Sequence, residues 1–318
     1  MTSTVDDDRP SLREETWQLL VASILHGTCT PFLGAGVSVP HLPRGSELAA
    51  TLAKEHEYPF ADDTNLARVS QYIASTRDSA FLKTLVLRHL EDRRKVAAQF
   101  LRGNPPENHL MLARLELPLY ITTNYDDYLE EAIRRVRSAP PFVEICRWSD
   151  RLVQELDKYR KAEPVQERPT IFHLHGHVSK PRSMLITEDD YIDFTVSLSQ
   201  RPMGKADPII PHFIRRALGD TNLLFLGYSL EDWNFRVLMR HLIKQQKILA
   251  YDRNSCLSIQ LSDNNMSPHK RRLAEKFLEE YLRTSAAIDV YWGDAEGFLE
   301  ELLRRVESGR RVNGDDAA

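Results

Sequence analysis

The chain has 318 residues, of which 42 are Lys or Arg and 46 are Asp or Glu, so its formal net charge at pH 7 is −4. With 42% apolar and 28% charged residues, the composition is that of a folded globular protein. The small negative charge argues against direct binding of nucleic acid, which normally needs a strongly basic surface. The three cysteines, Cys29, Cys146 and Cys256, stand far apart, which excludes a disulfide framework and a zinc ribbon.

The N-terminal segment, MTSTVDDDRP, is acidic and has no apolar stretch of the kind found in signal peptides. No apolar run approaches the roughly 18 residues that are needed to span a bilayer. We therefore expect a soluble, cytoplasmic protein that does not bind membranes.

The first predicted element is a helix from residue 11 to about residue 26, followed at 30–36 by TPFLGAG, a buried strand that ends in a glycine turn. Five later apolar runs have the same character and lie at 119–124, 170–176, 222–229, 256–261 and 287–292. Helical patterns at 127–136 and 230–244 lie between them. Short buried strands that alternate with helices predict an α/β fold, a Rossmann-like parallel sheet of about six strands with helices on both faces.

The spacing of these strands is uneven, because some eighty residues separate the first strand from the second. Several helical patterns fill this interval, so we expect a helical insertion at about 45–115 and a second one at about 178–220. We expect residues 1–308 to form a single domain, and the polar residues 309–318 to form a disordered tail.

The first strand is followed by a glycine turn, formed by Gly34, Ala35, Gly36 and, after Val37, Ser38. Glycines let a ligand approach the backbone, and free N–H groups in such a turn can bind phosphate. A tight strand-to-helix turn explains the glycines equally well. A standard dinucleotide fingerprint is absent, because Val39 stands where its third glycine belongs.

Asn124 and Asp126 follow the second strand, where side chains can reach a ligand crevice. An asparagine there can bind water or a sugar hydroxyl group. The residues alone favour a simpler interpretation, in which Asn124 belongs to a turn and Asp127 pairs with Glu130 to cap the next helix.

Three histidines, His173, His175 and His177, alternate at the end of the third predicted strand, and alternate residues of a strand share a face. One of them is a candidate general base, and buried structural histidines are the second interpretation. A metal site ranks third, because it needs a carboxylate or cysteine ligand and none is evident nearby. We therefore predict no metal ligands.

Gly227, Ser229 and Asp232 end the fourth predicted strand and open a helix, a position that suits a phosphate or a ribose. Ser229 and Asp232 can equally well serve as helix caps. All four motifs follow predicted parallel strands, so that a single crevice would collect them.

The ordered set GAGVS, TTNYD, HLHG and FLGYS, closed by IDVYWGDAEGFLEELL, resembles the sirtuin (SIR2) superfamily over about residues 17–305. It is most similar to the zinc-free SIR2-like branch found in bacterial anti-phage defence. The resemblance implies that NAD is bound as a substrate and that a helical insertion replaces the zinc-ribbon small domain, so no zinc is expected.

The resemblance also implies roles for individual residues. Asn124 matches the family asparagine that positions water or the nicotinamide ribose, and His175 matches the catalytic histidine, which leaves His173 and His177 in support. The positions that match NAD-binding residues are Gly34, Ala35, Gly36 and Ser38 at the pyrophosphate, Asp126 near the carboxamide, and Gly227, Ser229 and Asp232 at the phosphate and ribose.

The departures from the family pattern favour one activity among three. Deacylases of the family usually carry a four-cysteine zinc ribbon, and a peptide-clamping strand follows their catalytic histidine; here HVSKPRSMLITEDDYIDF follows instead. We therefore expect an NAD⁺ glycohydrolase that releases nicotinamide and ADP-ribose, or a cyclised form of it. The alternatives are an NAD-dependent protein deacylase and a non-catalytic module that binds NAD or ADP-ribose.

An unrestrained NAD⁺ hydrolase would poison its own cell, and the chain has no recognisable sensor domain. By resemblance, we expect a homo-oligomer or a complex with a separate activator or sensor protein.

Overall fold

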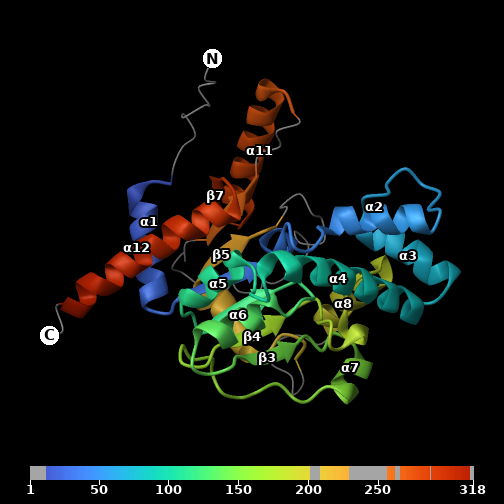
Figure 1. The fold of residues 1–318 in the computed structure, drawn as a ribbon, viewed down its shortest axis with the longest axis horizontal. Helices are drawn as coiled ribbons and strands as arrows, with labels where there is room; N and C mark the ends of the chain where they lie inside the picture. The colour runs from blue at the N-terminus through green and yellow to red at the C-terminus, as the bar shows by residue number, and fades with distance from the viewer. Residues whose placement is uncertain (1–11, 201–207, 229–255, 262–265, 287, 316–318) are drawn as a thin grey trace.

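The computed structural model describes residues 12–200, 208–228, 256–261, 266–286 and 288–315. At its centre is a sheet with helices around it (Figure 1). The sheet is wholly parallel, and its strands stand in the order β3-β4-β2-β1-β5-β6-β7. The strands are β1 Cys29–Leu33, β2 Leu119–Thr122, β3 Phe142–Ile145, β4 Thr170–His173, β5 Asn222–Leu226, β6 Cys256–Gln260 and β7 Ile288–Trp292. The α/β prediction is confirmed, with one strand more than expected.

The additional strand is β3, at the edge of the sheet beside β4. It has only four residues, FVEI, and none of them is fully buried. The six predicted strands are recognisable because they are mostly buried apolar runs. A short edge strand that carries Glu144 has no such pattern, and it is not predictable in this way.

Helices cover both faces of the sheet, as the parallel arrangement requires. One apolar layer is built by α1 Glu14–Leu25, α5 Glu107–Arg114, α6 Tyr128–Val136 and α12 Ala295–Asp315. The opposite layer is built by α7 Asp150–Glu155, α8 Glu188–Gln200, α9 His212–Asp220 and α11 Pro268–Ala286. Adjacent residues of a strand pack in opposite layers. Leu33 packs in the layer of α1, α5, α6 and α12, and Phe32 packs in the layer of α7, α8, α9 and α11.

Three further helices, α2 Gly45–Glu55, α3 Leu66–Thr76 and α4 Ser79–Leu101, form a lobe on the side of the molecule away from α1 and α12 (Figure 1). Their own apolar cluster includes Leu52, Ile73 and Val86 and is closed by Met184 and Ile186, which follow β4 and the short helix η2 Pro181–Ser183. Helices fill both predicted insertions, but α5, α8 and α9, which lie within them, pack on the sheet. The helix predicted at 230–244 lies outside the described residues.

The C-terminal helix α12 extends to Asp315, so the expectation of a disordered tail from residue 309 is wrong up to that point. Arg310 explains the extension, because its guanidinium donates hydrogen bonds to the carbonyls of Arg114 and Leu115 and pairs with Glu116. These contacts anchor the last turns on the end of α5.

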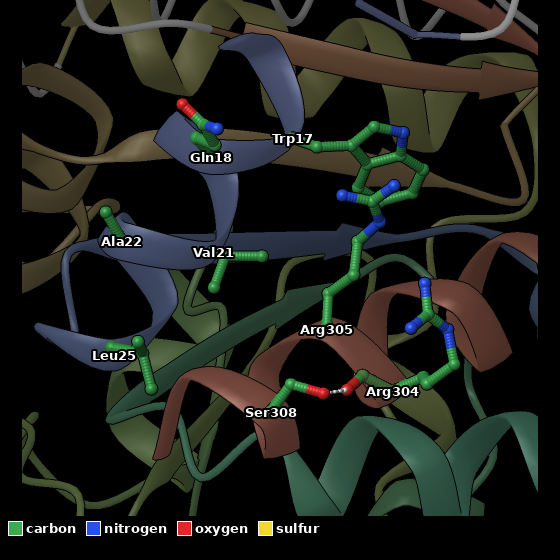
Figure 2. Close-up of a pocket in the computed structure, with 8 residues that line it drawn as sticks. All are labelled: Trp17, Gln18, Val21, Ala22, Leu25, Arg304, Arg305 and Ser308. Atoms are coloured by element: carbon green, nitrogen blue, oxygen red, sulfur yellow. Dashed lines mark hydrogen bonds between the residues drawn. The ribbon is translucent and has the colours of Figure 1, made fainter. Parts of the chain in front are cut away.

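A hollow of about 440 Å³ is lined by α1 and α12 together, and Figure 2 shows the residues that line it. In it the Arg305 guanidinium lies 4.9 Å from the centre of the Trp17 ring. None of the predicted site residues is among those lining it.

No helix in the described part of the chain combines the length and the apolar character that crossing a membrane requires.

Candidate functional site

The order of the strands creates a switch point at β1, which has β2 on one side and β5 on the other. Along the chain, β2 is added on one side of β1, whereas β5, which comes after β4 in the sequence, is added on its other side. In open parallel sheets such an edge forms the ligand crevice. The described parts of all four sequence motifs lie along this edge, after β1, β2, β4 and β5.

The glycine turn after β1 is fixed against the residue that follows β5. The amide of Gly34 donates to the Leu226 carbonyl and that of Gly36 to the Gly227 carbonyl, both at 2.9 Å. A Cβ atom on Gly34 would lie 2.7 Å from the Gly227 oxygen. Two of the turn's N–H groups therefore bind the protein itself, contrary to the expectation that they are free for phosphate. Ala35, at the tip, is exposed to solvent.

Asn124 joins the first two motifs through its side chain. Its Nδ2 atom donates to the Gly34 carbonyl at 3.1 Å and to the Ser38 Oγ at 3.3 Å. The Ser38 hydroxyl in turn donates to Asp126 Oδ2 at 3.3 Å. The structure thus brings together predicted site residues that are almost ninety positions apart in the sequence.

The capping alternative for this segment is wrong. Asp127 occupies the N-cap position of α6 but makes no side-chain capping bond. Its carboxylate binds the Arg94 guanidinium instead, and the Glu130 carboxylate turns toward His173 and His177. Neither carboxylate is therefore used to cap the helix.

Asp126 is a half-buried residue whose carboxyl group has a raised pKa. Burial raises its pKa to about 6, and the negative charge of Asp127 adds to this, although the Tyr128 amide and the Ser38 hydroxyl stabilise the ionised form. A carboxyl group that titrates near neutrality at a strand end is a frequent property of functional sites.

Replacing Asp126 with asparagine should stabilise the protein more at high pH than at low pH. The folded-state pKa is raised, so the folded protein binds a proton more tightly than the unfolded chain and loses stability as the pH rises from about 4 to beyond 6. In chemical denaturation, we expect the gain of Asp126→Asn over wild type to be about 1 kcal/mol larger at pH 8 than at pH 5. The exposed Asp92→Asn is the control, and a gain that does not change with pH would contradict the prediction.

The three histidines do not share a face, because β4 ends at His173 and the backbone turns at Gly176, whose φ is +95°. The rings of His173 and His177 lie 4.4 Å apart, whereas His175 packs edge-on against Tyr191. Burial lowers the pKa of His175 to about 3, so that its imidazole is neutral at physiological pH.

His175 and Asn124 occupy equivalent places at the crevice edge. Thr122 and His173 are the last paired residues of β2 and β4, and each candidate follows two residues later. His173 also holds this edge, because its Nδ1 lies 3.1 Å from the Asn124 carbonyl and donates to it.

Glu130 is a site-edge residue that the sequence analysis missed. Its Oε1 atom lies 3.0 Å from His177 Nε2 and 3.6 Å from His173 Nε2. The expectation that no carboxylate stands near the histidines is therefore wrong. Burial opposes ionisation of Glu130, but the two imidazoles outweigh it and hold its pKa below the ordinary range. In the sequence, only helical spacing marks Glu130. It stands three residues before Ile133, a buried residue of α6, and therefore lies beside the apolar face of that helix.

Other supporting side chains were also not predicted. Asn108 donates from Nδ2 to the Val37 carbonyl at 3.1 Å, and the hydroxyl of Tyr228 lies 2.8 Å from the Thr123 hydroxyl and 3.0 Å from the Leu33 carbonyl. They hold the turns after β1, β2 and β5 in place. Gly227 lies at this junction with a φ of +73°, while Ser229 and Asp232 lie outside the described residues.

Comparison with known proteins finds a family model, described as a SIR2-like domain, that matches residues 118–282. The NAD(+) hydrolase ThsA of Acinetobacter baumannii (strain 532279) is 25% identical over 285 residues, which cover 86% of this chain and 52% of that protein. The NAD(+) hydrolase ThsA of Cytobacillus dafuensis is 25% identical over 292 residues, with the same coverage of 86% and 52%. The chain thus spans about half the length of these curated relatives. Because the family model covers half of the sequence and the fold agrees with it, the chain belongs to the SIR2-like domain family.

Proposed function

We propose that this chain hydrolyses NAD⁺ to nicotinamide and ADP-ribose. The observation that carries the proposal is the network at the switch point, in which Asn124 binds the glycine turn and Ser38 while Ser38 binds Asp126. The relatives named NAD(+) hydrolase support the same reaction. In this proposal the pyrophosphate lies against the turn formed by Gly34, Ala35, Gly36 and Ser38, without hydrogen bonds from the Gly34 and Gly36 amides, which bind the protein. Asp126 contacts the nicotinamide carboxamide, and Gly227, with Ser229 and Asp232, contacts the phosphate and ribose.

The reaction breaks the bond between ribose C1′ and the nicotinamide nitrogen. Nicotinamide leaves with the bonding electron pair as a neutral molecule, so its departure needs no general acid. The ribose passes through an oxocarbenium-like state, to which a water molecule adds at C1′. Asn124 would position that water or the ribose, and the neutral imidazole of His175 would take the proton that the water releases.

The test is a turnover assay with the purified chain and NAD⁺ under activating conditions, with nicotinamide and ADP-ribose measured by chromatography. We expect release in wild type and its loss in Asn124→Ala and His175→Ala. Consumption of NAD⁺ only together with an acylated peptide would instead indicate a deacylase. Calorimetric binding of NAD⁺ without turnover, even with every candidate activator supplied, would indicate a binding module.

We also propose that the activity is controlled and serves anti-phage defence by depleting NAD⁺, since unrestrained hydrolysis would harm the host. Control would come from self-association or from a separate activator. Light scattering combined with turnover measurements tests this proposal: a monomer that is fully active without any addition would contradict it.

A further inference from the structure

Glu130, His173 and His177 form a buried cluster at the edge of the candidate site. Glu130 comes from α6, His173 ends β4, and His177 follows four residues later; their exposed fractions are 6%, 1% and 5%. Each residue offers one ligand atom, and these three atoms lie within 4.8 Å of one another; Glu130 Oε1 is 3.0 Å from His177 Nε2 and 3.6 Å from His173 Nε2. Two imidazole nitrogens thus converge on one carboxylate oxygen inside the protein.

These three converging atoms are buried and have no hydrogen-bond partner within the described residues. The 3.0 Å separation of Oε1 from His177 Nε2 does not have hydrogen-bond alignment. An unpaired buried polar atom costs about 1–3 kcal/mol, and three at one point indicate a place for an additional bound group. We propose that this group is a divalent metal ion of the Zn²⁺ class.

The other polar atoms of Glu130 and His173 bind protein groups outside the cluster, as those of metal ligands usually do. His173 Nδ1 faces the Asn124 carbonyl, which only accepts, so the neutral ring carries its lone pair on Nε2. Glu130 Oε2 accepts from the Arg134 guanidinium at 2.9 Å, which directs Oε1 toward the histidines. Such partners orient ligands and fix the histidine tautomer.

His177 has two tautomers in its surroundings, and a metal selects one of them. Its Nδ1 lies 2.7 Å from the Ser179 hydroxyl and 3.2 Å from the Ser179 amide. When Nδ1 donates to the hydroxyl, Nε2 presents its lone pair to the cluster centre. When Nδ1 accepts from the amide, Nε2 carries the proton instead and has no lone pair for a metal.

The ligand chemistry and the spacing suit zinc. Two imidazoles and one carboxylate form a known Zn²⁺ ligand set, and bonds of about 2.0–2.1 Å in a tetrahedron place ligand atoms about 3.3 Å apart. The observed separations from Glu130 Oε1, 3.0 Å to His177 Nε2 and 3.6 Å to His173 Nε2, lie on either side of that value. Water would complete the tetrahedron.

The role of the ion would be to position a neighbouring residue rather than to take part in the reaction. An ion bound at His173 Nε2 would fix the orientation of the imidazole ring, whose Nδ1 donates a hydrogen bond to the Asn124 carbonyl. It would thereby hold the turn that carries Asn124. Neither the metal site nor its test depends on whether the chain hydrolyses NAD⁺.

The test uses the full-length chain, stripped with a chelator and then titrated with Co²⁺ as a spectroscopic substitute for zinc. We expect the visible absorption of tetrahedral Co²⁺ to saturate at one equivalent and to disappear when Zn²⁺ is added. Zn²⁺ should also raise the thermal midpoint of the stripped protein. A wild-type protein that shows no absorption and no thermal shift would overturn the proposal without any variant.

Two variants locate the ion. Glu130→Gln and His177→Asn, each checked for folding by circular dichroism, should lose the Co²⁺ absorption. The matched control is His175→Asn, two residues from His177 but outside the cluster, which should still bind one equivalent. Full Co²⁺ absorption in both cluster variants, or its loss in the control alone, would overturn the assignment.

Discussion

Asn124→Ala is expected to lower kcat for NAD⁺ hydrolysis by about 10²–10³-fold, the effect of removing a side chain that orients the reacting groups. The residue is only half-buried, and its Nδ2 atom already bonds the glycine turn and Ser38. Its truncation therefore removes a positioned amide from the crevice edge without opening the core. Steady-state release of nicotinamide measures the loss.

The stability of the same variant separates a local effect from unfolding. Removal of two hydrogen bonds at a partly exposed position should cost about 1–2 kcal/mol, so the protein should remain folded in the assay. Asn104→Ala, an exposed position between α4 and α5, is the matched control and should hydrolyse NAD⁺ like wild type. Near-normal turnover of Asn124→Ala would remove Asn124 from the mechanism.

The fold was predictable because most of its strands carry their own signal. Phe32 and Leu33 are both fully buried, since helices cover both faces of the sheet, and such strands are recognisable as continuous apolar runs. Glu144 interrupts that signal in β3, so the edge strand was missed. The helix ends are less visible, as α12 shows, because Arg310 binds carbonyls almost two hundred residues away.

The candidate site was predictable as a set of loops but not as a set of contacts. Parallel topology places the segments after β1, β2, β4 and β5 at one edge, so the chain order alone groups Gly34, Asn124, His175 and Gly227. No local sequence pattern indicates that the Glu130 carboxylate does not cap its helix and instead faces two histidines forty or more residues later. Such pairings are decided when the elements pack.

Gly227→Ala is expected to destabilise the protein more than Asn124→Ala does. The residue has a φ of +73°, where a side chain costs about 1–2 kcal/mol, and its Cβ atom would lie 2.4 Å from the Val37 nitrogen and 2.8 Å from the Gly34 oxygen. Overpacking adds about 1–3 kcal/mol. We therefore expect a total loss of about 2–5 kcal/mol in the free energy of unfolding, measured by chemical denaturation.

Gly103→Ala separates the two causes, because Gly103 has a similar φ of +76° but no atom within 4 Å of its added Cβ. It should lose only the backbone contribution of about 1–2 kcal/mol and keep its turnover. Gly227→Ala should also lose NAD⁺ hydrolysis under conditions where it stays folded, since its methyl group displaces the glycine turn after β1. Equal losses of stability in the two variants would show that this turn moves aside at no cost. The contact between the segments after β1 and β5 would then not be what holds the crevice in shape.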